Sequence, residues 1–169
     1  MSKQIESRLA TQSDLNNIFL IISACATRLK DRNLNDWSRY YTVERLKEKI
    51  EKQNGYVFSV DNVDMGVVFV SSDDLYYYSE TDLSKFAQPK SKGLYIGTLA
   101  IKPDFQHQGY ASQIIDFCKN LAKEKNIKYL RLDCNGSDES LVEFYKKRGF
   151  EVKSAMEKET EYLLLEIKI

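Results

Sequence analysis

The sequence has few of the residues that build metal centres and disulfide scaffolds. It contains one histidine, His107, and three cysteines, Cys25, Cys118 and Cys134, which stand far apart within apolar patterns. It holds neither a C-x-x-C pair nor a cluster of cysteine and histidine. This scarcity argues against a metal site and against a disulfide framework. Three widely spaced thiols are typical of reduced cysteines in a cytoplasmic protein.

The sequence also lacks a net charge and a long apolar run. Its 25 basic and 25 acidic residues cancel, so no overall field attracts nucleic acid or an anionic membrane surface. The longest apolar run, residues 18–26, contains Ser23 and is much shorter than the ~20 residues of a membrane span. Residues 1–8 are polar and hold no signal-peptide core. We therefore expect a cytoplasmic protein with neither nucleic acid nor membrane as a partner.

What is present is the composition of an ordinary globular chain. The 169 residues are 43% hydrophobic and 30% charged, with no repeats and no low-complexity tract. A chain of this length is most simply one domain, and we predict a single domain over residues 1–169. We expect the protein to act as a monomer or a homodimer.

Hydrophobic periodicity predicts strands and helices that alternate without a strict order. The predicted helices cover residues 15–29, 43–50, 111–125 and 139–148, with Ser13 or Asp14, Thr42, and Ser137 or Asp138 as caps of the first, second and fourth. The predicted strands cover residues 4–10, 55–60, 66–70, 94–101, 128–134, 150–153 and 161–169. Asp61-Asn62 marks a hairpin, and Gly149 suits the left-handed residue after a helix. The fold class is therefore α+β around one central sheet.

One predicted strand is followed by a short loop and the start of a helix. Residues 94–101 are apolar and end at Pro103, and Gly109 and Ala111 let the backbone of the loop approach a ligand closely. Unpaired N–H groups at the start of the next helix, together with the helix dipole, favour an anion. This order predicts a site for a phosphate-bearing ligand across the strand end.

Gln106-His-Gln-Gly-Tyr-Ala111 resembles the acyl-CoA signature Gln/Arg-x-x-Gly-x-Gly/Ala of the GNAT superfamily of N-acyltransferases. The strand Leu130-Arg-Leu-Asp-Cys134 follows at the family's spacing. Residues 141–150, which end in Tyr145-Lys-Lys-Arg-Gly-Phe150, then resemble the family's Tyr-x-x-x-Gly-Phe segment. The resemblance covers nearly the whole chain. It implies a mixed, mostly antiparallel sheet of about seven strands flanked by about four helices, splayed between strands 4 and 5.

The resemblance further implies transfer of an acetyl group from acetyl-CoA to a primary amine of a small molecule or peptide by direct attack. The backbone of residues 106–111 would hold the diphosphate, and the end of the strand at Leu99 would pair with the pantetheine arm. The residues so assigned to the cofactor are Leu99, Ala100, Ile101, Gln106, His107, Gln108, Gly109, Tyr110, Ala111, Asn135, Asp138 and Tyr145. Asp138 stands where the family often has Asn, and it could instead be only a helix cap.

The implied catalytic groups are the amide of Leu99 and the phenol of Tyr145. The amide would stabilise the oxyanion, an interaction worth roughly 3–4 kcal/mol. Tyr145 would protonate the leaving thiolate, either in concert with its departure or with a lowered pKa; the alternative is a packing aromatic beside Phe144. Cys134 near the thioester raises the idea of an acyl-cysteine, but a buried free cysteine is the commoner case.

The general base and the acceptor pocket are left open by the sequence. Many family members carry Glu four residues before the oxyanion donor, where this chain has Tyr95. A water chain, a carboxylate of Asp73 or Asp74, or a lowered pKa of the acceptor could serve instead. Trp37, Tyr41, Tyr76 and Tyr95 are the candidate acceptor-binding residues.

The missing Glu also motivates a second hypothesis, an acyl-CoA-binding or sensing module with little or no catalysis. The connection at residues 71–92 is long for a loop and polar, which favours either a functional loop or partial order.

Overall fold

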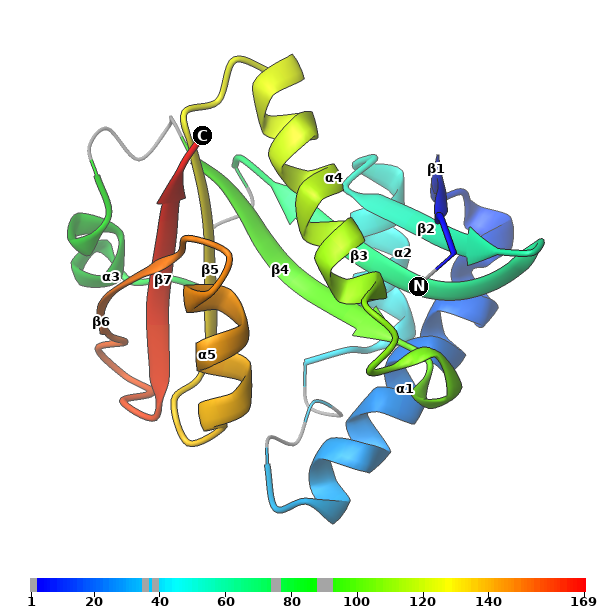
Figure 1. The fold of residues 1–169 in the computed structure, drawn as a ribbon, viewed down its shortest axis with the longest axis horizontal. Coiled ribbons are helices and arrows are strands. Elements are labelled where there is room, and N and C mark those ends of the chain that lie inside the picture. The colour runs from blue at the N-terminus through cyan, green and yellow to red at the C-terminus, as the bar shows by residue number, and fades with distance from the viewer. Residues whose placement is uncertain (1–2, 35–36, 38–39, 74–76, 88–92) are drawn as a thin grey trace. The chain divides into compact units, whose positions relative to one another are not determined.

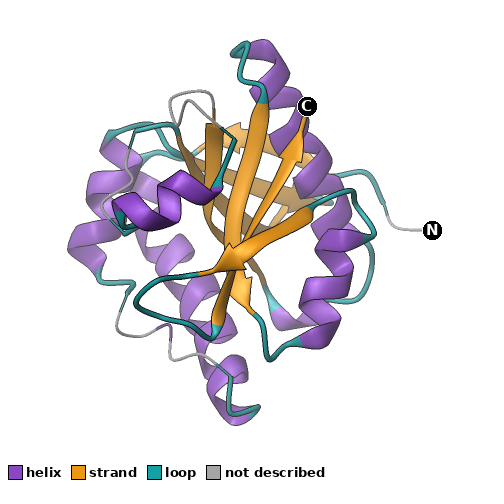
Figure 2. Cartoon of the chain, turned by 90° about the vertical axis from the view of Figure 1, so that its left-hand side faces the viewer, coloured by secondary structure: helices purple, strands orange, loops and turns teal. Residues whose placement is uncertain are grey.

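The strands form one mixed seven-stranded sheet in the order β1-β2-β3-β4-β5-β7-β6 (Figure 1). The computed structural model describes residues 3–34, 37, 40–73, 77–87 and 93–169. The strands are β1 (Glu6–Leu9), β2 (Gly55–Val60), β3 (Val63–Ser71), β4 (Gly93–Ile101), β5 (Tyr129–Asn135), β6 (Glu151–Ala155) and β7 (Tyr162–Lys168). The helices are α1 (Leu15–Asp31), α2 (Val43–Glu51), α3 (Glu80–Lys85), α4 (Tyr110–Glu124) and α5 (Glu139–Lys146). Figure 2 distinguishes them from the connecting loops. The predicted α+β class and mixed sheet are confirmed.

The chain divides into two compact units. Unit 1 contains Met1–Val70 and Thr98–Phe117, and unit 2 contains Ser71–Gly97 and Cys118–Ile169. Three elements therefore run through both units: β3 has its last residue, Ser71, in unit 2, β4 changes unit between Gly97 and Thr98, and α4 changes unit between Phe117 and Cys118.

Unit 1 packs α1 and α2 on a small antiparallel sheet. β1 pairs with β2, and β2 with β3, through a hairpin in which Asp61 and Asn62 have φ angles of 51° and 62°. Two consecutive positive φ angles are the mark of a type I′ turn, which the Asp-Asn pair favours. The buried core consists of Ala10, Ile18, Ile21, Ile22, Cys25, Leu46, Ile50, Val57, Val67, Phe69 and Ala100.

The caps of unit 1 are partly those that the sequence predicts. Thr42 caps α2, since its hydroxyl accepts a hydrogen bond from Arg45 N at 3.3 Å. Asp14 stands at the N-cap position of α1, as one of the two predicted alternatives has it, but its side chain makes no capping hydrogen bond to α1, which follows a 3₁₀ turn at Gln12–Asp14. Thr11 begins that turn with a capping box in which the Asp14 carboxylate accepts from Thr11 N at 2.8 Å.

Unit 2 centres on β5 and β7, which pair antiparallel over seven residues, with β6 added at the edge. α5 packs on β5, and α3 contacts β6 (Figure 1). α3 is a helix that the sequence analysis did not predict within residues 71–92. Its Ser79 and Asp82 form a reciprocal capping box. Gly149 follows α5 with φ of 90°, as its type predicts.

The parallel ladder between β4 and β5 is short. It joins Gly93 with Tyr129 through Ile96 with Leu132, all within unit 2. β4 continues for five residues beyond Ile96, and β5 continues from Asp133 to Asn135. The end of this ladder is where the predicted splay between strands 4 and 5 falls.

Candidate active site

The loop after β4 belongs to unit 1 and has an unusual backbone. It opens with a 3₁₀ turn at Pro103–Phe105, where proline occupies the first position. His107 and Gly109 then adopt positive φ angles of 60° and 86°. Left-handed residues within a turn direct successive N–H groups to one side, which makes a concave site for an anion.

The main-chain donors of this loop are largely available. Within the described part of the chain, the N–H groups of residues 107–111 make no hydrogen bond of acceptable distance and angle. Gln106 N is different, because it donates to Pro103 O at 3.2 Å. Tyr110 and Ala111 open α4, whose first amides have no intrahelical acceptor. Residues 107–111 can therefore bind a diphosphate, with the α4 dipole behind them, and Gln106 cannot contribute its amide.

The loop is held in place by its own side chains. Gln106 Nε2 donates to Ile101 O at 2.7 Å, and Gln108 Nε2 donates to Asp104 O at 2.7 Å. Both carboxamides therefore bond back to the protein. A guanidinium nitrogen of Arg28 on α1 lies 3.5 Å from His107 Nε2. This contact places a positive charge beside the loop, where it favours an anion.

The predicted pantetheine segment, Leu99–Ile101, ends β4. Leu99 is partly exposed, whereas Ala100 and Ile101 are 1% and 6% exposed. The carbonyl of Ile101 already accepts hydrogen bonds from Gln106 Nε2 and from the Cys25 thiol at 3.0 Å. The oxygen of Ile101 is therefore occupied by the protein.

Two of the predicted acceptor residues meet within unit 1. The rings of Trp37 and Tyr41 lie 5.4 Å apart, centroid to centroid, and the Tyr41 hydroxyl accepts a hydrogen bond from Thr98 Oγ1 at 2.6 Å. Thr98 precedes Leu99, so Tyr41 reaches β4 one residue before the proposed oxyanion donor. Tyr76 lies outside the described residues.

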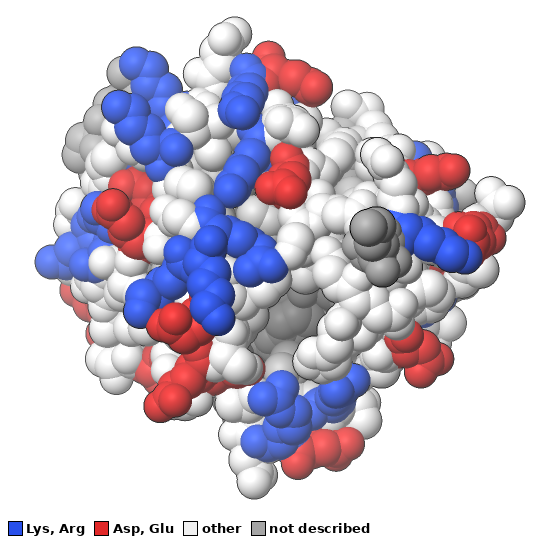
Figure 3. Space-filling model, viewed as in Figure 1, with Lys and Arg blue, Asp and Glu red and all other residues white. Residues whose placement is uncertain are grey.

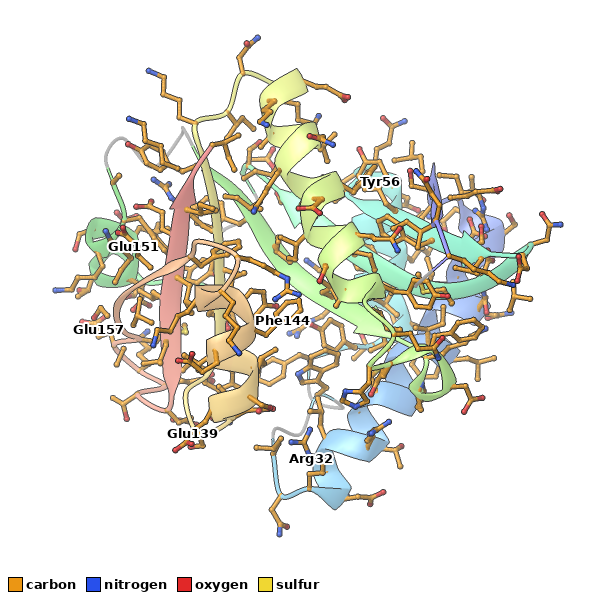
Figure 4. The ribbon with its side chains drawn as sticks, viewed as in Figure 1. Arg32, Tyr56, Glu139, Phe144, Glu151 and Glu157 are labelled. Carbon is orange, nitrogen blue, oxygen red and sulfur yellow. The ribbon has the colours of Figure 1, made fainter. Side chains whose placement is uncertain are left out.

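Tyr145 lies in unit 2 on α5 and is 7% exposed. Its ring packs edge-on against Phe150 at 5.5 Å and against Phe144, which is labelled in Figure 4, at 5.2 Å. Burial raises the pKa of the phenol above its ordinary value of 10, and Cys134 raises it further. The structure therefore does not lower this pKa. In the described part of the chain, no hydrogen bond holds the phenol.

The side chains of Asn135 and Asp138 accept hydrogen bonds at the start of α5. Asn135 Oδ1 accepts from Ser137 N at 2.8 Å, and Asp138 Oδ1 accepts from Leu141 N at 3.2 Å and from Ser140 Oγ at 2.7 Å. Asp138 is thus the N-cap of α5, as one of the two sequence alternatives predicts. Each side chain has a structural partner at the place assigned to the cofactor.

Tyr95 is built into the core of unit 2. It is 3% exposed, and its phenol oxygen accepts a hydrogen bond from Arg131 Nη1 at 2.8 Å. Arg131 in turn pairs with Glu166 at 2.7 Å, and both of these charged residues are buried. The position at which many relatives carry a catalytic Glu is therefore occupied by a tyrosine that accepts a hydrogen bond from a buried arginine.

The sequence analysis missed one polar group of unit 2. The carboxylate of Asp133 accepts hydrogen bonds from the phenols of Tyr77 and Tyr78 at 3.0 and 2.7 Å. Burial raises the pKa of Asp133 to about 6, against the lowering effect of these two bonds. The only sign of this group in the sequence is an acidic residue near the end of an apolar strand. Its tyrosine partners are 55 and 56 residues away in the chain, so no local pattern indicates them.

The cysteines of this chain are buried thiols. All three cysteines are free and buried, and burial raises the pKa of Cys118 and of Cys134 to about 12. A search of the described residues finds no group of three or more His, Cys, Asp or Glu able to hold a metal. None of the helices described is long and apolar enough to cross a membrane. Basic and acidic side chains both occur on the face shown in Figure 3.

The mixed sheet, with its parallel β4–β5 pair and its amide-lined loop before α4, defines an acyltransferase fold of the type that binds coenzyme A. The family model for the Acetyltransferase (GNAT) family matches residues 23–150, which is more than half of the chain. The chain therefore belongs to the GNAT family and is an acetyl-CoA-dependent N-acetyltransferase.

The individual relatives are distant but cover most of the chain. The "uncharacterized N-acetyltransferase YesJ" of Bacillus subtilis is 25% identical over 150 residues, which are 86% of this chain and 81% of YesJ. A GNAT-family acetyltransferase from Listeria monocytogenes superposes with a TM-score of 0.76 at 21% identity, covering 98% of this chain and 95% of that one. PaiA N-acetyltransferase from Thermoplasma acidophilum, solved in complex with coenzyme A, gives 0.62 at 18% identity, covering 99% and 100%.

Proposed function

We propose that this protein transfers the acetyl group of acetyl-CoA to a primary amine of a small molecule or peptide, by direct attack within a ternary complex. The observation that carries the proposal is the run of available amides at residues 107–111. Five consecutive donors at a helix start fit a diphosphate, and the coenzyme A complex of the PaiA relative supports the same ligand. Both units together would form a single acetyltransferase domain.

Stabilisation of the oxyanion and protonation of the departing sulfur each have a candidate group in this chain. The amide of Leu99 would donate to the oxyanion as the amine nitrogen attacks the thioester carbon. The carbon–sulfur bond then breaks, and Tyr145 would give its proton to the departing sulfur. Because burial raises the phenol pKa, Tyr145 is always protonated near neutral pH, and proton transfer in concert with departure is favoured over a pre-ionised phenol.

The other predicted site residues would use their backbone, or side chains that also have structural partners in the protein. His107, Gln108, Gly109, Tyr110 and Ala111 would bind through the backbone. Asn135 and Asp138 would contact coenzyme A in addition to accepting hydrogen bonds at the start of α5. Trp37 and Tyr41 would line the amine site. Tyr95 is buried, so it would influence the amine site indirectly, through its hydrogen bond with Arg131.

Calorimetry with coenzyme A tests the first half of the proposal, and release of free coenzyme A from acetyl-CoA in the presence of amines tests the second. We expect binding, and turnover with at least one primary amine. Failure to bind coenzyme A would overturn the proposal entirely. Binding without turnover would instead favour an acyl-CoA-binding module, a reading supported by the tyrosine at position 95.

A further inference from the structure

The carboxylate of Asp133 is held by two phenols. Tyr77 donates to one carboxylate oxygen at 3.0 Å and Tyr78 to the other at 2.7 Å. The two tyrosines are adjacent in sequence and their rings meet at 5.1 Å, so the pair acts as one support. Tyr77 is 38% exposed and Tyr78 is 9% exposed. The carboxylate is thereby fixed in orientation while one side of its support faces solvent.

Asp133 occupies a particular place on β5. The parallel ladder with β4 ends at Leu132, so Asp133 is the first residue of β5 beyond it. Side chains alternate along a strand, so Asp133 projects to one face and Cys134 to the other. Asp133 shares its face with Arg131.

Other side chains of unit 2 also lie on one face of β5 or on the other. Tyr78 packs against Phe86 and Tyr95, and both of these rings contact Arg131, which places the two tyrosine donors on the Asp133 face. Tyr145 stands on α5, which packs on β5, and Cys134 raises the pKa of its phenol more than Asp133 does. The carboxylate and the phenol of Tyr145 therefore approach β5 from opposite faces, within electrostatic reach of each other.

This arrangement suits a reaction in which a base takes a proton from the attacking amine and an acid gives a proton to the departing sulfur. We propose that Asp133 is the general base of the acetyl transfer and accepts the proton of the attacking amine, with Tyr77 and Tyr78 as its positioning residues. The inference rests on the proposed function. The carbon–nitrogen bond forms, the N–H proton passes to the Asp133 carboxylate, the carbon–sulfur bond breaks, and the sulfur takes the Tyr145 proton. Exchange with solvent restores both groups, and the products are an amide and free coenzyme A.

The charges around Asp133 make it a better base than an ordinary aspartate. Burial raises its pKa to about 6, the two phenols lower it, and the neighbouring Glu159 raises it. At neutral pH the carboxylate is ionised, yet it binds a proton about 100-fold more tightly than an unperturbed aspartate. Arg131, which shares this face of β5 with Asp133, donates hydrogen bonds to Glu166 and Tyr95. The base that position 95 does not provide is thus found on the adjacent strand.

The test uses the intact protein, acetyl-CoA, and the primary amine that gives the fastest release of coenzyme A in a panel of diamines, amino acids and peptides. We expect Asp133→Asn to lower kcat at least 100-fold, with the affinity for coenzyme A changed less than threefold. The matched control is Asp116→Asn, since Asp116 is an exposed aspartate in the middle of α4 and lies outside the loop of residues 106–111. This control should keep wild-type kcat.

The pH profile distinguishes catalysis from a merely structural contact. In the wild type, kcat/KM should fall below an apparent pKa near 6, where Asp133 becomes protonated. Tyr77→Phe removes a hydrogen bond to the ionised form, so the acid limb should move to higher pH while the half-exposed ring keeps its packing. Should Asp133→Asn keep wild-type kcat, or the limb stay in place in Tyr77→Phe, the assignment of Asp133 is wrong and the acetyltransferase proposal stands. Coenzyme A binding with no turnover on any amine would overturn both.

Discussion

The guanidinium of Arg131 lies 2.7 Å from the carboxylate of Glu166, and the two side chains are 0% and 5% exposed. Arg131 also donates to Tyr95 and to the carbonyl of Ala87, and it lies over the rings of Phe86 and Tyr129. A buried ion pair of this kind is costly to break, because the remaining charge stays buried after the opposite charge is removed.

Glu166→Gln should therefore lower the free energy of unfolding by about 3 kcal/mol or more, measured by urea denaturation. The control is Glu151→Gln, whose side chain is 79% exposed and lies 3.8 Å from Lys153. An exposed pair contributes less than about 1 kcal/mol, so this variant should be close to wild type. Equal stabilities for the two variants would show that the Arg131–Glu166 pair is not a buried charge pair in solution.

Two substitutions in the loop of residues 106–111, called here the amide loop, test whether its backbone binds coenzyme A. Gly109→Val forces a β-branched residue to φ of 86° and should weaken binding of coenzyme A at least tenfold by calorimetry, since it displaces the amides. His107→Gly removes the ring but suits φ of 60°, so the affinity should change by less than about threefold. A large loss in His107→Gly would mean that the imidazole, or its contact with Arg28, binds the ligand.

The ion pair between Asp14 and Arg8 predicts a pH-dependent stability. Arg8 and the Thr11 backbone outweigh the effect of burial and hold the pKa of Asp14 at about 2, below the 3.8 of the unfolded chain. The resulting stabilisation, up to about 2 kcal/mol, is present above pH 4 and disappears as pH falls toward 2. Denaturation of the wild type and Asp14→Asn should thus differ most near neutral pH and converge in acid. A constant difference at every pH would contradict the lowered pKa.

The raised pKa of Tyr145 predicts the shape of the alkaline side of the kcat profile. The phenol stays protonated past pH 10, so the wild type should show no loss of kcat between pH 7 and 10 that depends on Tyr145. Tyr145→Phe should lower kcat about 100-fold across this range without changing the profile, while coenzyme A binding persists. An alkaline limb present in the wild type and absent from the variant would indicate a lowered pKa instead.

Local signals in the sequence predict much of this fold. Thr42, Asp138, the Asp61-Asn62 turn and Gly149 each act through their own backbone neighbourhood, and the structure confirms them. α3 was missed because six residues have too little periodicity to be recognised. Its only local signal is Ser79 followed by Asp82, the spacing of a capping box.

The contacts of the site are harder to predict from the sequence, because the residues that meet there lie far apart in the chain. Nothing near residue 133 indicates that Tyr77 and Tyr78 bind Asp133, and nothing near residue 95 indicates Arg131. The amide loop was predicted because it is built from consecutive residues. The occupation of Gln106 N by Pro103 O was not, since it depends on the exact turn.

Because β4 and α4 each change unit along their length, neither unit is one continuous stretch of the chain. No single cut in the polypeptide can separate the two units, because residues 71–97 of unit 2 lie between the two stretches of unit 1, and residues 98–117 of unit 1 lie between the two stretches of unit 2. Limited proteolysis is therefore expected to yield nicked molecules whose pieces remain associated, rather than a smaller stable fragment.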